Sequence, residues 1–241
     1  MAYLRCDIWS DSLQMTTSIT AILPDVGELK AAKVVYLLHG LSDNCSCWSR
    51  FTAVERYANE YGAAVIMPEV QRSFYTDMAL GVGYFTYVQK ELPQICARLF
   101  GLSQKREQNF VMGLSMGGYG ALKCALTAPW QYAGCAGFSS VTDMERRADS
   151  NSPEMRAIFG VPVMVPESAS LTKLLETQNA TDLPRFFMTC GEQDRLYEEN
   201  CNFAKALEEK GAALEFLHWP GNHTWDFWDA SVKMALDKLL I

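Results

Sequence analysis

Ser115 lies at the centre of a G-x-S-x-G pattern that also contains Gly113 and Gly117. The pattern follows an apolar run typical of a buried strand and precedes a run of small residues that favours a helix. In such a strand–turn–helix unit, small flanking residues allow a sharp turn that exposes the serine hydroxyl. The positive end of the helix dipole then faces the position where an oxyanion forms during acyl transfer. We therefore predict a nucleophilic serine; the alternative is a tightly packed turn.

A serine hydroxyl needs a base, because it is a weak nucleophile at neutral pH. The chain has three histidines, which are His39, His218 and His223. His223 lies in a loop between a strand pattern at 213–218 and the last predicted helix, where an α/β-hydrolase carries its base. His218 ends that strand pattern beside Trp219 and is interpreted as structural. His39 precedes Ser115, whereas the base in this arrangement follows the serine and the acid along the chain. We therefore expect His39 to shape a loop near the serine.

The acid that orients the histidine should follow the strand pattern before that of His223. The run 185–190 is such a pattern, and Gly191-Glu192-Gln193-Asp194 comes directly after it. Asp194 is therefore the first choice. Glu192 in the same turn and Asp143 after the preceding strand pattern stay open as alternatives. Each of the three could instead be a solvated turn residue or a helix N-cap.

Two backbone N–H groups should stabilise the oxyanion. Met116 follows the serine and supplies one of them. The second is expected from Leu41, in a loop that follows the strand pattern at 34–38 and begins with His39 and Gly40. The glycine lets this backbone turn inward.

Further motifs surround these residues. They are His39-Gly40-Leu41-Ser42-Asp43-Asn44 to Trp48, Arg72-Ser73-Phe74-Tyr75-Thr76-Asp77, Glu91-Leu92-Pro93, Gly113 to Ala121, Cys190 to Asp194 with Leu196-Tyr197, and His223 to Trp228. Over nearly the whole chain, these motifs resemble the esterase D family. That family includes bacterial tributyrin esterases, S-formylglutathione hydrolases, and feruloyl and acetyl esterases of carbohydrate esterase family 1. The short length and the segment 73–76 are most similar to the compact tributyrin esterase branch.

The resemblance implies that Ser115, Asp194 and His223 form a triad and that Leu41 and Met116 donate to the oxyanion, in agreement with the reading of the residues. Three residues depart from the family pattern: Cys45 and Cys47 in the oxyanion loop, and Asn222 before the histidine. They leave the catalytic groups in place and concern what fits the mouth of the site.

Alternation of strand and helix patterns predicts one α/β domain over residues 1–241, and the resemblance implies that this domain has the α/β-hydrolase fold. We expect a mostly parallel twisted sheet with helices on both faces. The run 3–22 differs, because it predicts two antiparallel edge strands joined by a turn near Asp11 and Ser12.

Residues 139–182 interrupt this alternation, and a loop of that length is usually functional. We predict a small cap over the serine, with a structural insertion on the sheet edge as the alternative. Apolar and aromatic side chains near the motifs are candidate walls of the substrate site, although large aromatics also belong in cores. The candidates are Trp48, Phe74, Tyr75, Tyr119, Phe159, Met164 and Trp225.

Composition limits the classes of partner. The chain has 28 acidic and 21 basic residues, a net charge of −7, which argues against nucleic-acid or anionic-membrane partners. The N-terminus lacks the apolar stretch of a signal peptide, so we expect a cytoplasmic protein with reduced cysteines. Cys45 and Cys47 have no companion His or Cys pair, which disfavours a metal site. The predicted chemistry needs no cofactor, and association into a homo-oligomer is left open.

These residues together predict a serine carboxylesterase that hydrolyses short-chain acyl esters, of the tributyrin, acetyl or feruloyl esterase type, through an acyl-enzyme. The substrate would be a small-molecule or sugar-linked acyl ester. S-formylglutathione hydrolysis, the same chemistry on a thioester, is one alternative. A non-catalytic binding protein with the hydrolase fold is the other.

Overall fold

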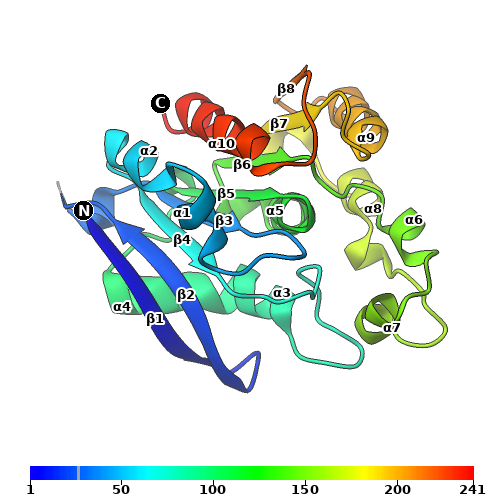
Figure 1. The fold of residues 1–241 in the computed structure, drawn as a ribbon, viewed down its shortest axis with the longest axis horizontal. Coiled ribbons are helices and arrows are strands. Elements are labelled where there is room, and N and C mark those ends of the chain that lie inside the picture. Colours follow the sequence, from blue (N-terminus) through cyan, green and yellow to red (C-terminus); the bar gives the residue numbers. More distant parts are fainter. Residues whose placement is uncertain (26–27) are drawn as a thin grey trace.

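The computed structural model describes residues 1–25 and 28–241, and eight strands form one sheet across it (Figure 1). The strand order is β1-β2-β4-β3-β5-β6-β7-β8. The strands are β1 (Ala2–Ser10), β2 (Met15–Leu23), β3 (Val34–Leu38), β4 (Ala64–Pro68), β5 (Asn109–Leu114), β6 (Gly134–Phe138), β7 (Arg185–Gly191) and β8 (Leu214–Trp219). In this order β4 lies between β2 and β3, and β3, β5 and β6 lie in the interior of the sheet.

The predicted antiparallel edge is confirmed. β1 pairs with β2 along its whole length, from Ala2 opposite Leu23 to Ser10 opposite Met15. β2 continues antiparallel onto β4, and every later pair of strands is parallel. Strands β3 to β6 are buried at every residue, as expected for parallel strands covered on both faces. This is the predicted α/β-hydrolase architecture.

Helices cover both faces of the sheet (Figure 1). On one face, α4 (Leu92–Phe100), α5 (Met116–Thr127) and α9 (Tyr197–Lys210) pack into one apolar cluster with α8 (Leu171–Glu176). On the other face, a second cluster joins α1 (Cys47–Phe51), α2 (Val54–Glu60) and α10 (Trp225–Leu239). Glycines in left-handed conformation follow α4 and α9, because Gly101 and Gly211 have φ of 70° and 83°.

The helical segment at 84–100 contains a wide turn that the sequence pattern did not predict. It begins as α3 (Tyr84–Thr86), passes through a π-helical turn at Tyr87–Glu91 and continues as α4. Pro93 has no N–H, so the carbonyl of Gln89, four residues earlier, loses its usual helical donor. The side chain of Gln131 donates to that carbonyl at 3.1 Å instead. A side chain from another element thus completes the hydrogen bonding of the turn.

The segment 139–182 folds into short helices at the right of Figure 1, across the molecule from β1. It contains α6 (Met144–Ala148), α7 (Pro153–Phe159) and α8, together with 3-10 turns at Glu167–Ala169 and Ala180–Asp182. The side chains of Asp143, Ser152 and Ser170 cap the three helices by accepting backbone N–H groups.

Side chains from outside this segment hold its two ends. At the first end, the Asn200 amide accepts from Ser140 N at 3.1 Å and donates to Ser140 O at 2.8 Å. At the second end, the Arg106 guanidinium donates to the carbonyls of Asp182 and Leu183 at 3.0 and 3.2 Å. Both junctions are therefore fixed to the main fold independently of the residues between them.

Further 3-10 turns lie at Leu29–Ala31, Arg106–Gln108 and Pro129–Gln131. No helix in the described part of the chain is long and apolar enough to span a bilayer. The eight cysteines are all unpaired thiols, and six of them are buried.

Candidate active site

Ser115 lies between β5 and α5 with strained backbone angles, φ 52° and ψ −114°. The strand and the helix meet so closely that a Cβ on Gly113 would lie 2.3 Å from the carbonyl oxygen of Gly117. Neighbouring backbone stabilises the strained residue, because Ser115 N donates to Phe138 O at 2.8 Å and Val141 N donates to Ser115 O at 3.1 Å. The local geometry is that of the predicted sharp turn.

The structure brings the predicted triad residues together. Nε2 of His223 lies 3.0 Å from Oγ of Ser115, and Nδ1 of His223 lies 2.7 Å from Oδ2 of Asp194. The other carboxylate oxygen of Asp194 accepts from Leu196 N at 2.9 Å. Burial alone raises the pKa of Asp194, but the hydrogen bonds from His223 and Leu196 outweigh it and lower the pKa below its usual value. An ionised carboxylate therefore faces the imidazole at neutral pH.

The two alternative acids have other partners. Asp143 caps α6 by accepting from Arg146 N at 2.9 Å. Glu192 lies 3.0 Å from Nδ1 of His218, on the exposed side of β8. Asp143 is therefore a helix N-cap, which was one of the alternatives. Glu192 is the partner of His218 and not of His223.

The loop predicted to bind the oxyanion begins at the end of β3 and is held in a compact turn. Gly40 N donates to the Asp43 carboxylate at 3.1 Å, and Asp43 N donates to Gly40 O at 3.2 Å. A Cβ on Gly40 would lie 2.6 Å from the side chain of Leu114 and 2.7 Å from the Asp43 carboxylate, so a larger residue here would have to displace both side chains. Leu41 lies in the wall of the cavity beside Ser115, and Met116 is the first residue of α5. Across the described chain, the N–H groups of these two residues make no hydrogen bond within the protein.

Three side chains hold the backbone from which this loop starts. His39 is buried; its Nε2 accepts from Val70 N, which leaves Nδ1 to donate to Gly40 O at 2.7 Å. Trp48 donates to Leu38 O at 3.0 Å, and the Tyr75 hydroxyl donates to His39 O at 3.0 Å. His39 therefore shapes the loop that contains Leu41, as the sequence predicted.

A cavity of about 410 Å³ opens beside Ser115. Its walls come from the ends of β3 and β5, the loop after Asp194, and the start of α10. The lining residues are Gly40, Leu41, Ser42, Asp43, Leu114, Ser115, Arg195, His223, Thr224, Trp225 and Trp228. Among the predicted walls, Trp225 is present, and its ring meets Trp48 and Trp228 edge-on at 5.3 Å.

Two charged residues of this cavity were missed by the sequence analysis. Asp43 is partly buried, and burial raises the pKa of its carboxyl above the usual value, although the hydrogen bond that Gly40 N donates acts in the opposite direction. Arg195 is exposed and places a guanidinium at the rim. Both stand within two residues of a predicted site residue in the sequence, and that adjacency is the signal that could have found them.

The other predicted walls lie elsewhere, which corrects the expectation. Trp48, Phe74, Tyr75 and Tyr119 are at most 1% exposed and belong to the core. The Tyr119 hydroxyl donates to Ala169 O at 2.7 Å, so it anchors the segment 139–182. Packing holds these rings in the core. The Tyr75 ring, for example, lies so close to Gly120 that a Cβ on this glycine would be 2.4 Å from a ring carbon.

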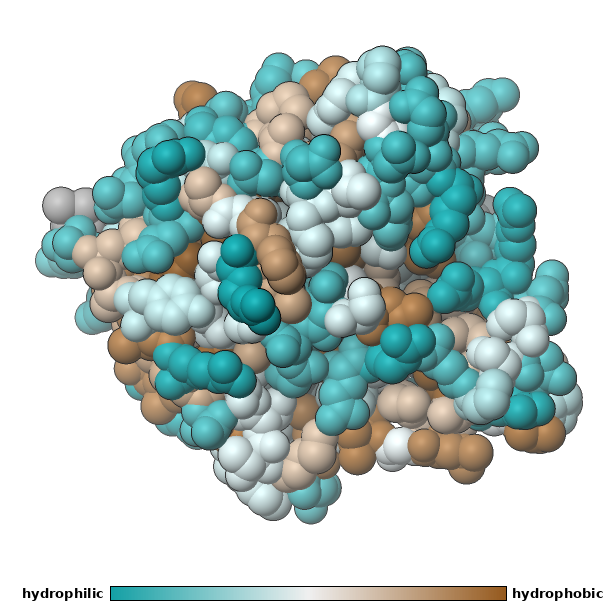
Figure 2. Space-filling view, viewed as in Figure 1, coloured by the Kyte–Doolittle hydropathy of each residue, from teal (hydrophilic) through white to brown (hydrophobic). Residues whose placement is uncertain are grey.

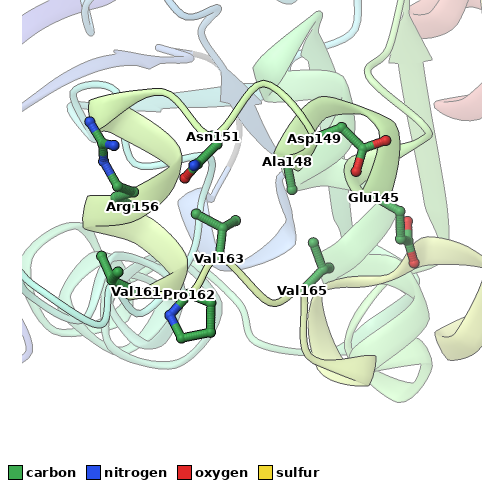
Figure 3. Close-up of a pocket in the computed structure, with 9 residues that line it drawn as sticks. All are labelled: Glu145, Ala148, Asp149, Asn151, Arg156, Val161, Pro162, Val163 and Val165. Carbon is green, nitrogen blue, oxygen red and sulfur yellow. The ribbon is translucent and has the colours of Figure 1, made fainter.

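Phe159 and Met164 are also outside the cavity beside Ser115. Phe159 packs partly buried against the core, and Met164 is 70% exposed. On the face shown in Figure 2, brown apolar atoms appear at the lower right, where α7 lies in Figure 1. The segment instead forms its own cavity of about 610 Å³ between α6, α7 and residues 161–165 (Figure 3). Glu145, Asp149, Arg156 and three valines share that wall, so it mixes charged groups of both signs with apolar groups.

The residues that depart from the family pattern do not line the cavity beside Ser115. Cys45 and Cys47 are buried, and burial raises the pKa of both thiols. Cys47 Sγ accepts from Asn44 N at 3.4 Å and so packs within the loop. Among residues 1–25 and 28–241, no cluster of three or more His, Cys, Asp or Glu side chains could hold a metal ion.

Comparison with known proteins agrees with this geometry. Residues 10–239 match the family described as putative esterase. The chain belongs to this esterase family. An acetyl esterase from Caldicellulosiruptor saccharolyticus is 30% identical, over 98% of this chain and 97% of the relative.

Two solved structures from Staphylococcus aureus are each 34% identical to this esterase. One is the fluorophosphonate-binding serine hydrolase FphF, with a TM-score of 0.93 over 100% of this chain and 98% of its own. The other is the S-formylglutathione hydrolase FrmB, with a TM-score of 0.90 over 100% and 99%. The protein is thus a carboxylic ester hydrolase of the serine type with the α/β-hydrolase fold.

Proposed function

We propose that Ser115 is the nucleophile of this esterase, with His223 as its base and Asp194 as the acid that orients the base. The hydrogen-bonded chain from Ser115 through His223 to Asp194, at 3.0 and 2.7 Å, carries this proposal. Nε2 of His223 takes the hydroxyl proton as Oγ attacks the ester carbonyl. Asp194 holds the imidazole in the tautomer that leaves Nε2 free to accept, and stabilises the imidazolium that forms.

The N–H groups of Leu41 and Met116 are proposed to hold the oxyanion. Both are free of hydrogen bonds within the described protein, and they flank the serine from the β3 loop and the start of α5. Collapse of the tetrahedral intermediate passes the proton from His223 to the leaving alcohol and leaves an acyl group on Ser115. Water, deprotonated by His223, then releases the acid by the reverse sequence.

The proposed substrates are esters of short acyl chains, with acetyl esters first. A site of about 410 Å³ is near the small end of ligand pockets, and its apolar walls are Leu41, Leu114, Trp225 and Trp228. The acetyl esterase relative supports the same class. Sugar-linked acyl esters and a cytoplasmic location stay predictions of the sequence.

Replacing the nucleophile tests the proposal. Ser115→Ala should reduce hydrolysis of p-nitrophenyl acetate by several orders of magnitude, because binding and the oxyanion donors alone give only about 10³–10⁴ over water. Ser42→Ala is the matched control, since Ser42 is an exposed hydroxyl in the same cavity. Near-normal turnover by Ser115→Ala, or an equal loss in Ser42→Ala, would refute the assignment.

Thioester hydrolysis is the second candidate, favoured by the 34% identity to the S-formylglutathione hydrolase FrmB. The guanidinium of Arg195 at the cavity rim could pair with a carboxylate of glutathione. If this activity dominates, kcat/KM for S-formylglutathione should exceed that for p-nitrophenyl acetate. Arg195→Ala should then raise KM for the thioester alone. A reversed kcat/KM ratio, with no selective effect of Arg195→Ala, decides for the ester.

A further inference from the structure

Strand β1 leaves a long free edge at the end of the sheet. It runs over nine residues, Ala2–Ser10, and lies at the outer left of Figure 1 beyond β2. In the described chain, no strand pairs with its outer side. Free edges are usually blunted by charged side chains, above all lysine, by proline or by a bulge, because their N–H and C=O groups otherwise pair with another chain. β1 contains neither lysine nor proline, its two charged residues Arg5 and Asp7 are of opposite sign, and its pairing with β2 continues without interruption.

The side chains of β1 alternate strictly between two faces. Tyr3, Arg5, Asp7 and Trp9 are exposed, while Ile8 is buried and Leu4 and Cys6 are half-buried. Tyr3 and Trp9 are 46% and 58% exposed, which is unusual for large aromatics on a strand. The exposed face therefore carries, in order along the strand, an aromatic ring, a positive charge, a negative charge and a second aromatic ring.

This order is complementary to itself in one antiparallel register. When two copies of β1 pair antiparallel around a two-fold axis perpendicular to the sheet, side chains that lie opposite each other are on the same face. One residue must then lie opposite its own copy, and the axis is named below by that residue. An axis at Cys6 places Arg5 opposite Asp7 of the second copy, twice, and Tyr3 opposite Trp9, twice. Opposite charges and aromatic pairs in these positions stabilise sheets.

The neighbouring registers are unfavourable. An axis at Arg5 places the two copies of that cation opposite each other, and an axis at Asp7 does the same with two carboxylates. Like charges directly opposite destabilise a sheet. Charge thus selects the register centred on Cys6.

The other edge of the sheet lacks this complementarity. In β8, an axis at Phe216 places Glu215 opposite Leu217, and an axis at Leu217 places Glu215 opposite Trp219. Neither register pairs opposite charges. The self-complementary pattern belongs to β1 alone of the two edges.

We propose that two copies of this esterase associate through antiparallel pairing of their β1 strands around Cys6, so that one sheet runs through both. The partner is a second copy of this chain. β1 is separated from β5, which leads to Ser115, by three strands. The association therefore leaves the proposed catalytic residues outside the contact, and hydrolysis should not depend on it.

Sedimentation velocity over a concentration series tests the proposal, from about 1 µM to about 300 µM because a strand edge is a small interface. The wild type should shift from monomer to dimer. Arg5→Asp and Asp7→Arg should each weaken the dimer roughly tenfold or more, because each places like charges opposite twice. The double variant Arg5→Asp/Asp7→Arg restores opposite charges and should recover the dimer. Glu215→Lys on β8 is the control and should behave as the wild type.

Ester turnover reports whether each variant folds, which is needed because Asp7 also accepts from Ser18 Oγ at 2.6 Å. A monomeric wild type throughout the series overturns the proposal. Single variants that turn over substrate and dimerise as the wild type also overturn it, as does an active double variant that stays monomeric.

Cysteine crosslinking tests the register separately. Opposite residues of antiparallel strands have Cα atoms about 4.5–5.5 Å apart, within the range of a disulfide. Diamide should therefore join Cys6 of one copy to Cys6 of the other; the two thiols are oxidised to one disulfide while diamide is reduced to the hydrazine. The crosslinked dimer should be absent from Cys6→Ser and reduced in Arg5→Asp. A crosslink that persists in Cys6→Ser would contradict the register.

Discussion

Asp194→Asn changes one atom of the proposed triad and should abolish most of the activity. In the wild type, one carboxylate oxygen accepts from Leu196 N at 2.9 Å and the other from His223 Nδ1 at 2.7 Å. An asparagine has only one oxygen for these two donors. When that oxygen faces Leu196, the amide NH₂ points at Nδ1 and donates to it. Nε2 of His223 then carries the proton and cannot accept another from Ser115.

The expected loss follows from this tautomer. Because the side chain of Asp194 is fully buried, water cannot replace the missing acceptor. The corresponding change in serine hydrolases costs on the order of 10⁴ in kcat, which equals about 5.5 kcal/mol of transition-state stabilisation at 1.36 kcal/mol per tenfold. The amide is isosteric, so KM and the far-ultraviolet circular dichroism should change little.

The assay is steady-state hydrolysis of p-nitrophenyl acetate at pH 7.5, with Asp143→Asn and Glu192→Gln as matched controls. Asp143 caps α6 and Glu192 contacts His218, so both controls should keep kcat close to that of the wild type. Should Asp143→Asn lose activity while Asp194→Asn keeps it, the acid belongs to the loop after β6 and the reasoning fails.

Three further predictions concern selectivity and stability. Trp225→Ala should change the ratio of kcat/KM between acetate and octanoate esters by roughly tenfold or more, because it removes a cavity wall, whereas Met164→Ala should leave the ratio unchanged; equal effects would return Met164 to the substrate site. Burial raises the pKa of Glu91, but bonds from Ser10, Asp11 and Ser12 outweigh it and lower the pKa. Its stabilisation is thus present above the unfolded pKa and lost as pH falls through the folded pKa; Glu91→Gln should lower the unfolding free energy at pH 7 by about 1–3 kcal/mol, and a gap that persists undiminished at pH 3 in urea titrations would count against this. Burial lowers the pKa of Lys123 to about 8, so the folded state disfavours the ammonium most below that pH. Relative to Lys123→Met, the unfolding free energy of the wild type should rise by up to about 3 kcal/mol between pH 8 and 10.5. A difference in unfolding free energy that does not change with pH would refute the burial argument.

The fold and the meeting of Ser115, His223 and Asp194 could be predicted because local patterns encode them. Gly113 and Gly117 are needed for a close approach that no larger residue allows, and this need is visible in the sequence. Parallel strands then bring the loops after β5, β7 and β8 to one edge of the sheet, so the order of Ser115, Asp194 and His223 along the chain is informative.

The walls of the site could not be predicted in the same way. Trp48 and Tyr75 lie close in sequence to the oxyanion loop, yet their polar atoms bind backbone carbonyls while their rings fill the core. Aromatic residues suit both places, and only tertiary packing decides between them. The π-helical turn escaped prediction for a similar reason, since Gln131, which completes it, is distant from Pro93 in the chain.

The segment 139–182 is fastened at Ser140 by Asn200 and at Asp182 by Arg106, and between these points Val161 and Met164 are 74% and 70% exposed. Its interior forms a cavity of its own and contributes no wall beside Ser115. Protein engineers could therefore insert a reporter peptide at residues 161–164, which leaves the bond from Val141 N to Ser115 O and the buried side chains of α7 and α8 in place.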